Sequence, residues 1–211
     1  MESLNIIRTF MPIEIIPPQK DGGKSDNTYS VTCFNEHEAI NLFRKSAKRL
    51  LDVNNWENIC DGIIKANFKL CNELGKNVDR LAKETDYFKI DIPGPGPVDG
   101  EGYDWVRIES ISTEADKIND TDLISIRVRP ASCPLNNKQS IAHFFTNTAT
   151  TTFLIKRKGC LVTAEIHGRN EKPNEHTVNI IDAVRNKVVA NGAILSFSDI
   201  QWKQLVIAFL S

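Results

Sequence analysis

Four stretches in the second half of the chain alternate between apolar and polar residues, and this alternation constrains the fold more than any other feature of the sequence. They are Asp104 to Ser112, Leu123 to Arg129, Thr150 to Arg157 and Leu161 to His167. Successive side chains of a β-strand point to opposite faces, so each stretch predicts a strand that buries one face. Lys158-Gly159 joins the last two stretches, a length that suits a tight hairpin. The second half of the chain is therefore predicted to form an antiparallel sheet.

The first half adds shorter elements to this sheet. Further strands are predicted at Tyr29 to Phe34, Ala66 to Glu73 and Tyr87 to Ile92, which are rich in β-forming residues or alternate in polarity. Between the first two, apolar residues recur at steps of three and four from Ile40 to Leu51. This spacing predicts an amphipathic helix, and Asn35 is placed to cap its start.

The C-terminal end of the chain reads as helical. An apolar stripe predicts a helix from Val178 to Ala190, which Asn191-Gly192 is expected to stop. Ser198 and Gln201 are then placed to cap a separate final helix. The whole chain is predicted to comprise an N-terminal arm (residues 1–20), a polar linker (residues 21–28) and a single α+β domain (residues 29–211), with a Pro/Gly-rich loop over residues 93–102.

Composition and charge exclude several classes of function. The 26 basic and 27 acidic residues nearly cancel, so the chain lacks the basic excess of a nucleic-acid-binding protein. We expect neither a signal peptide nor a membrane span, since no apolar run is long or pure enough. The five cysteines are widely and irregularly spaced, which favours small core residues in a reducing compartment. The predicted location is therefore the cytoplasm.

The order of these elements resembles a known superfamily. A strand, a helix, six antiparallel strands and a long C-terminal helix are the order of the helix-grip, or START-like, superfamily, which includes polyketide cyclases and lipid-transfer domains. The segment DVNNWENI, residues 52–59, is similar to the tryptophan-bearing stretch that follows the first helix in that superfamily. The resemblance spans Tyr29 to Asn191 and implies a curved antiparallel sheet of about six to seven strands packed around the C-terminal helix. It also implies an internal cavity for a small apolar or amphipathic ligand, and it carries no catalytic residue with it.

The alternation assigns the strand residues to two faces of different chemistry. One face is apolar, with Val106, Ile108, Ile124, Ile126, Val128, Val162, Ala164 and Ile166. The other collects Arg107, Glu109, Arg127, Arg129, Thr163, Glu165 and His167. These charges either decorate a solvated sheet face, where ion pairs contribute about 0–1 kcal/mol each, or face a cavity. In a cavity the three arginines would hold an anionic ligand, and Glu165 or His167 would move a proton.

Other site chemistries find little support in the sequence. The candidate ligand-binding residues are Arg107, Glu109, Arg127, Arg129, Glu165, His167 and Trp105. The segment from His167 to His176 gathers further polar groups, but a polar connecting loop before the helix is the favoured interpretation. No HExxH motif, paired-cysteine pattern, phosphate-binding glycine loop or GxSxG motif occurs, so neither a metal nor a cofactor is expected.

Three functional hypotheses remain open. The first is a domain that binds a small amphipathic or anionic ligand between the sheet and the helix predicted from Val178 to Ala190, for which a cavity below about 300 Å³ would be too small. The second is a structural or interaction protein that docks, for example as a homodimer, through its apolar N-terminal arm or its final helix. The third is a cyclase-like or hydrolase-like enzyme, although no set of acid, base and nucleophile is recognisable.

Overall fold

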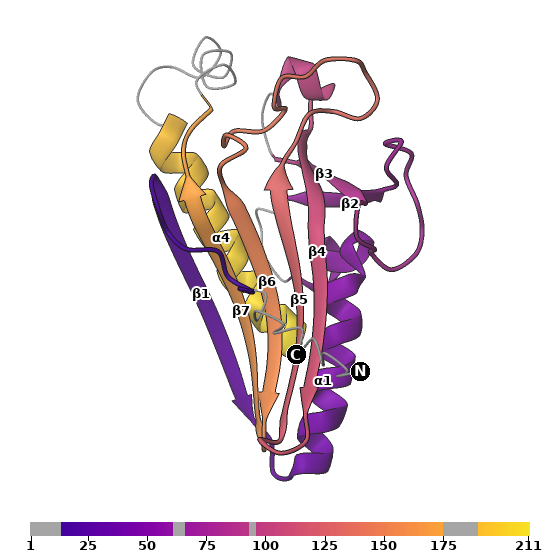
Figure 1. Ribbon diagram of the computed structural model, residues 1–211, viewed down its shortest axis with the longest axis vertical. Coiled ribbons are helices and arrows are strands. Elements are labelled where there is room, and N and C mark those ends of the chain that lie inside the picture. The colour runs from indigo at the N-terminus through magenta and orange to yellow at the C-terminus, as the bar shows by residue number, and fades with distance from the viewer. Residues whose placement is uncertain (1–13, 61–65, 93–95, 175–189) are drawn as a thin grey trace, which may run out of the picture.

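The protein folds into one curved antiparallel sheet with helices on a single face (Figure 1). The computed structural model describes residues 14–60, 66–92, 96–174 and 190–211. Its elements are β1 (Gly23–Thr32), α1 (Glu36–Leu51), α2 (Trp56–Ile59), β2 (Asn67–Cys71), β3 (Tyr87–Asp91), β4 (Asp104–Asp116), β5 (Thr121–Pro130), β6 (Thr150–Lys158), β7 (Leu161–Glu171) and α4 (Ala190–Leu210), with short 3-10 turns at Val53–Asn55 and Val98–Gly100. Within the described residues the sheet has seven strands in the order β1-β7-β6-β5-β4-β3-β2.

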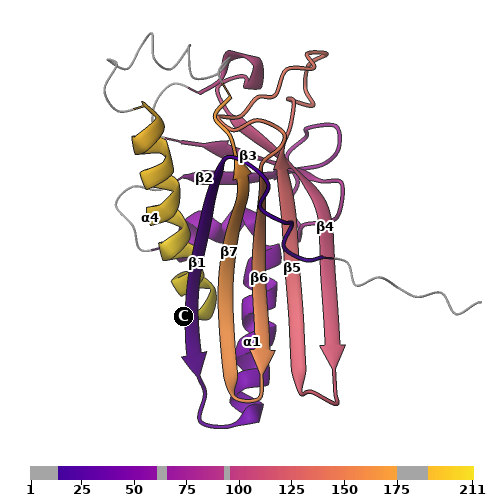
Figure 2. The same ribbon diagram turned by 60° about the vertical axis from the view of Figure 1, so that its left-hand side comes forward.

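The two faces of the sheet are covered differently. The helices α1 and α4 pack on one face, which we call the inner face (Figure 1). On the outer face, residues 14–22 cross the strands from β4 towards β1 (Figure 2). Asn170 fixes this crossing segment, because its side-chain oxygen accepts the N–H groups of Lys20 and Asp21 at 2.7 and 3.1 Å. The inner face therefore carries the hydrophobic core, and the outer face carries a polar layer.

The predicted alternation is confirmed on the inner face. All eight residues assigned to the apolar face are buried in the main core cluster. Around them, the Trp56 ring makes edge contacts with Phe68, Phe88 and Phe209 at centroid distances of 5.3–5.7 Å. The tight hairpin is also confirmed, since Lys158 pairs with Leu161 at the end of β6 and β7. The alternation of apolar and polar residues thus correctly predicts both the strands and the side chains that they bury.

The predicted linker over residues 21–28 is wrong from Gly23 onward, where β1 begins. This stretch is polar because its strand lies at the sheet edge and its side chains meet polar partners. Asp26 pairs with His167 on the outer face, and Ser25 contacts Glu171 on the inner face. Hydrophobic patterning could not reveal a strand whose neighbours are themselves polar.

Two C-terminal predictions are also corrected. Asn191-Gly192 does not end a helix but lies inside α4, which runs unbroken past Ser198. A glycine in a helix costs about 1 kcal/mol relative to alanine, and burial of Leu205, Val206 and Phe209 outweighs that cost. β7 continues to Glu171, so the loop predicted from His167 begins too early. The helix predicted over Val178 to Ala190 lies almost entirely outside the described residues.

The cysteines follow the sequence prediction only in part. Cys60, Cys71 and Cys133 are buried core residues, as expected. Cys33 and Cys160 instead lie half-buried where β1 ends and β7 begins.

Candidate functional site

An apolar pocket lies between the inner face of the sheet and α4. Its walls are made by Phe68, Phe88, Ile90, Val106, Val128, Phe153 and Trp202, and by Phe144 and Phe145 from the segment before β6. The cavity volume is about 40 Å³, enough for one or two water molecules and far below the roughly 300 Å³ of an ordinary ligand pocket. The pocket thus lies between the sheet and a C-terminal helix, as the resemblance implies, but that helix is α4 and not the one predicted over Val178 to Ala190, and the pocket is nearly closed.

Four polar side chains, those of Glu171, Gln201, His143 and Thr151, line this largely apolar pocket. Glu171 enters it from β7, and its carboxylate accepts a hydrogen bond from the Ser25 hydroxyl at 3.3 Å. Burial raises the pKa of Glu171 above its ordinary value. Gln201 enters from α4, where its side-chain oxygen accepts the Ala66 N–H at 3.0 Å. The pocket therefore combines a large apolar surface with one partly desolvated carboxyl group.

The third polar group is His143, which lies in the segment IAHFF before β6. Complete burial lowers the pKa of His143 to about 3, so the ring is neutral near pH 7. Its Nδ1 accepts the Phe145 N–H at 2.9 Å, which leaves the ring proton on Nε2. The imidazole is therefore a neutral hydrogen-bond donor at the pocket wall.

A buried aspartate positions the segment that carries His143. Asp104 at the start of β4 accepts the Phe144 N–H at 2.9 Å. Burial raises the pKa of Asp104 to about 7, although that hydrogen bond acts to lower it. On the other side, the Asn174 amide donates to the carbonyls of Ile141 and His143 at 3.0 Å. Both contacts fix the ring of His143 against the pocket.

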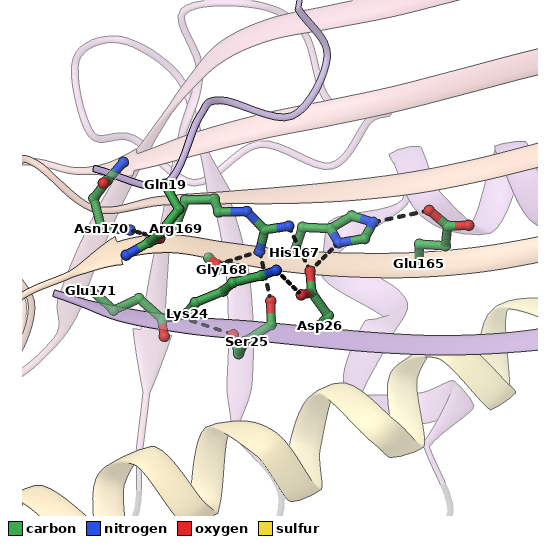
Figure 3. Close-up of polar contacts among 10 residues, drawn as sticks. All are labelled: Gln19, Lys24, Ser25, Asp26, Glu165, His167, Gly168, Arg169, Asn170 and Glu171. Atoms are coloured by element: carbon green, nitrogen blue, oxygen red, sulfur yellow. Dashed lines mark hydrogen bonds and ion pairs between the residues drawn. The ribbon is translucent and has the colours of Figure 1, made fainter. Parts of the chain in front are cut away.

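The sequence-predicted site residues lie elsewhere, on the outer face. Glu165 and His167 belong to β7 and point away from α4, where Asp26 of β1 joins them (Figure 3). The His167 Nδ1 lies 2.5 Å from Asp26, and its Nε2 lies 2.9 Å from Glu165. Arg169 pairs with Asp26 at 2.6 Å, and Lys156 pairs with Glu165. These side chains form one ion network rather than a ligand cavity.

The remaining candidates form a second outer-face group. Glu109 sits at an irregularity in the β4–β5 register and pairs with both Arg127 and Arg129. Arg127 also donates to the Glu14 carbonyl at 3.2 Å, so the N-terminal segment partly covers this group. Arg107 is exposed on β4.

Trp105, the remaining candidate, is fully buried outside the pocket. It lies in a small separate cluster with Cys71, Cys133 and Ala142. Its indole N–H donates to the Gly100 carbonyl at 3.0 Å. The structure therefore brings none of the seven candidates to the pocket.

The ion network on the outer face shifts the pKa values of His167 and Asp26. Burial alone would lower the pKa of His167, but hydrogen bonds to Glu165 and Asp26 outweigh burial and raise it. The pKa of Asp26 falls to about 2, because hydrogen bonds from His167 and Arg169 outweigh its partial burial. Both ring nitrogens of His167 are held by carboxylates, so neither is free to accept a proton from a substrate. This arrangement links β1 to β7 at the edge of the sheet.

We expect His167→Gln to lower the free energy of unfolding by about 1–3 kcal/mol at pH 6, because two charged hydrogen bonds are lost. The wild-type contribution is complete below the unfolded pKa of about 6.5 and is lost as the pH rises through the raised folded pKa. Urea unfolding at several pH values between 6 and 9 measures both effects. The difference between the two proteins should shrink as the pH rises, and a constant difference would show that His167 is not charged in the fold.

Sequence reasoning missed the polar groups of the pocket. Glu171 and His143 are single polar residues, and no spacing motif connects them with Gln201, which was read only as a helix cap. The one available signal was a histidine within the apolar run IAHFF. Asp26 was missed because it fell in the predicted linker.

Two further properties bear on the class of site. In the part of the chain that the structure describes, no three His, Cys, Asp or Glu side chains gather closely enough to hold a metal ion. None of the described helices has the length and apolar character needed to cross a bilayer.

Comparison with known proteins gives matches at the level of solved structures only. No protein-family model matches the sequence, and no curated protein does. A hypothetical protein from Helicobacter pylori matches with a TM-score of 0.48 and 15% identity, covering 98% of each chain. A norcoclaurine synthase point mutant from Thalictrum flavum matches with a TM-score of 0.32 and 8% identity, covering 90% of this chain and 98% of the other. A major latex-like protein from Panax ginseng matches with a TM-score of 0.33 and 14% identity, covering 87% and 99%.

The strand order of the chain itself identifies its architecture. The first strand pairs with the last, the other strands follow in sequence order, and the C-terminal helix closes the inner face. The predicted α+β class and the helix-grip resemblance are therefore confirmed at the level of the fold. The chain has the helix-grip fold. In its described residues, a curved seven-stranded antiparallel sheet packs against a long C-terminal helix.

Proposed function

We propose that the protein binds a small apolar molecule with a hydrogen-bond-donating head, such as an amine, between the sheet and α4. The observation that supports this most is Glu171, a partly desolvated carboxyl group at the wall of a pocket that is mostly apolar. A carboxyl group in such a place costs free energy unless a donor meets it. Its present donor is the Ser25 hydroxyl at a long 3.3 Å, which leaves acceptor capacity for a ligand.

The cavity is smaller than the roughly 300 Å³ that the ligand-binding hypothesis requires, so the proposal requires the pocket to widen when a ligand enters. The described cavity of about 40 Å³ cannot hold a ring-sized molecule. Trp202 of α4 contacts Phe153 and Phe68 across it, at centroid distances of 5.4 and 6.3 Å. A ligand that takes the place of the Trp202 ring against these phenylalanines would regain their apolar contacts. The opening cost lowers the apparent affinity in proportion to the population of the open state.

The head of the ligand sets the expected selectivity. Glu171 accepts hydrogen bonds, and an amine head would add a charge-assisted bond of about 1.5–3 kcal/mol. A ligand without a donor would leave the carboxyl group desolvated and unpaired. Selectivity for a donor head over a purely apolar molecule follows from this difference.

Benzylamine and toluene test the proposal because they differ by a single amine. We expect benzylamine to bind at least tenfold more tightly, since about 1.4 kcal/mol corresponds to tenfold. Titration followed by protein NMR measures both affinities and locates the site through the shifts of Trp202 and Phe153. Glu171→Gln should remove the preference, whereas Glu109→Gln on the outer face should leave it intact.

A variant that fills the pocket provides a second test of the proposal. Ala66 lines the pocket, so Ala66→Leu should weaken both compounds by taking up the space they need. Equal affinities for the two compounds in the wild type, or shifts confined to the outer face, would reject the proposal. The alternative of docking through the apolar N-terminal arm concerns residues that lie mostly outside the described part of the chain.

A further inference from the structure

Two of the five cysteines face each other across neighbouring strands at one end of the sheet. Thr32 and Leu161 form the last residue pair of the β1–β7 ladder. Cys33 follows that pair on one strand, and Cys160 precedes it on the other. The Cys33 N–H donates to the Cys160 carbonyl at 2.9 Å, which places the two residues directly opposite each other. They lie about 130 residues apart in the sequence, so the fold alone brings them together.

The two cysteines lie next to the last inward-facing residue pair of the β1–β7 ladder. Val31 and Val162 are paired, and both contribute to the inner core. Cys33 lies just past the end of β1 and packs against the main core, whereas Cys160 lies in the two-residue turn between β6 and β7. The two thiols lie close enough that Cys160 contributes to raising the pKa of Cys33. Opposite residues of an antiparallel pair have Cβ atoms about 4.5–5.5 Å apart, whereas a disulfide needs about 3.5–4.5 Å. A small local adjustment at the strand ends is enough to bond the two sulfurs.

Solvent access distinguishes this pair from the other cysteines. Cys33 and Cys160 are half-buried, whereas Cys71 and Cys133 share a small core cluster and are only 0% and 2% exposed. Cys60 is equally buried, beside Gln201. A small oxidant in solution therefore reaches Cys33 and Cys160 before the other cysteines. The buried Cys71 and Cys133 provide an internal comparison within the same chain.

We propose that Cys33 and Cys160 are a reversible oxidation site that hydrogen peroxide converts into a cross-strand disulfide. One thiolate attacks the peroxide O–O bond, becomes a sulfenic acid and releases hydroxide, which takes up the proton lost by the thiol. The second thiol then attacks the sulfenic sulfur and displaces water. In sum, two thiols and one hydrogen peroxide give one disulfide and two waters, and a dithiol reductant reverses the change.

The reaction should accelerate at alkaline pH. Burial and the nearby carboxylate of Glu38 raise the pKa of the Cys33 thiol above its ordinary value. Since only the thiolate attacks peroxide, cross-linking should be slow at neutral pH and faster as the pH rises. The disulfide would tie the end of β1 to the β6–β7 hairpin and close a long loop, which stabilises the fold.

The test uses the full reduced chain treated with a small excess of hydrogen peroxide. Intact mass spectrometry should show the loss of two hydrogens, and peptide mapping should join the Cys33 and Cys160 peptides. The melting temperature should rise by several degrees and return to its starting value with dithiothreitol. Cys33→Ser and Cys160→Ser should each abolish the cross-link, whereas Cys71→Ser and Cys133→Ser should retain it.

Several results would overturn the proposal. A disulfide that maps to another pair, a cross-link only between chains, or oxygen addition without any cross-link would each do so. Circular dichroism of the serine variants separates loss of the bond from loss of the fold. Because both residues are half-buried at strand ends, these variants are expected to fold.

Discussion

Trp56→Ala is expected to lower the free energy of unfolding by about 3–5 kcal/mol, the largest single loss that we anticipate. The side chain is fully buried, and its ring contacts Phe153 at a centroid distance of 4.8 Å in addition to three other phenylalanines. Its indole N–H also donates to the Arg49 carbonyl at 3.0 Å, at the end of α1. The substitution therefore opens a cavity and removes one of the two donors to this helix carbonyl, which also accepts the Asp52 N–H at 3.3 Å.

Urea unfolding followed by circular dichroism measures this loss. Trp56→Phe should recover much of the stability, because it keeps a ring in the cluster and loses only the hydrogen bond and part of the volume. Ile118→Ala serves as the control, since Ile118 is 95% exposed and should change stability by less than about 0.5 kcal/mol. A loss below about 1 kcal/mol for Trp56→Ala would contradict the central place of this residue in the core.

Arg157→Met should lower the free energy of unfolding by about 2–4 kcal/mol. The Arg157 side chain is only 5% exposed, and it pairs with Asp120 and Asp122 at 2.7 Å. It also donates to the Gly159 carbonyl at 3.0 Å. Hydrogen bonds that Arg157 donates to both aspartates hold its pKa above its already high ordinary value. The guanidinium thus joins the turn between β4 and β5 to the turn between β6 and β7, and its loss leaves two carboxylates close together.

The partial exposure of both aspartates places the expected loss near the lower end of that range. Adding Asp120→Asn and Asp122→Asn to Arg157→Met should restore part of the stability, because the repulsion between the carboxylates is removed. Chemical unfolding of the single and triple variants forms the relevant comparison. Lys158→Ala, at the neighbouring exposed position, is the matched control. If the triple variant were no more stable than Arg157→Met, electrostatics would not explain the loss.

The parts of the fold that the sequence predicts correctly are those where burial alone selects the residues. Strands β4 to β7 each place one set of apolar residues on the inner face, so alternation locates them within a few residues. Where a strand meets polar partners, the same reasoning fails. β1 contains Lys24, Ser25, Asp26 and Asn27, and its partners include His167 and Glu171. Only the three-dimensional pairing shows why that sequence forms a strand.

The candidate site was predictable to a smaller extent. The position of the pocket follows from the helix-grip resemblance, whereas the charged residues of the outer face pair with one another instead of lining it. Alternation correctly separated the two faces, but it cannot indicate which face lies beneath α4. Glu171 reaches the pocket because the backbone departs from regular strand geometry at Asn170, where φ is 56°. Strict alternation over these residues would misplace it, so a residue pattern alone could not assign Glu171 to the pocket.

The pairing of the first strand with the last has a consequence for synthesis on the ribosome. β1 and α1 emerge early, yet the edge partner of β1 runs to Glu171, most of the chain later. At roughly 5–20 residues per second, on the order of ten seconds pass before that partner exists. During this interval the apolar stripe of α1 has no completed sheet to cover it. The apolar stripe of α1 therefore stays without its native cover until β7 has been made.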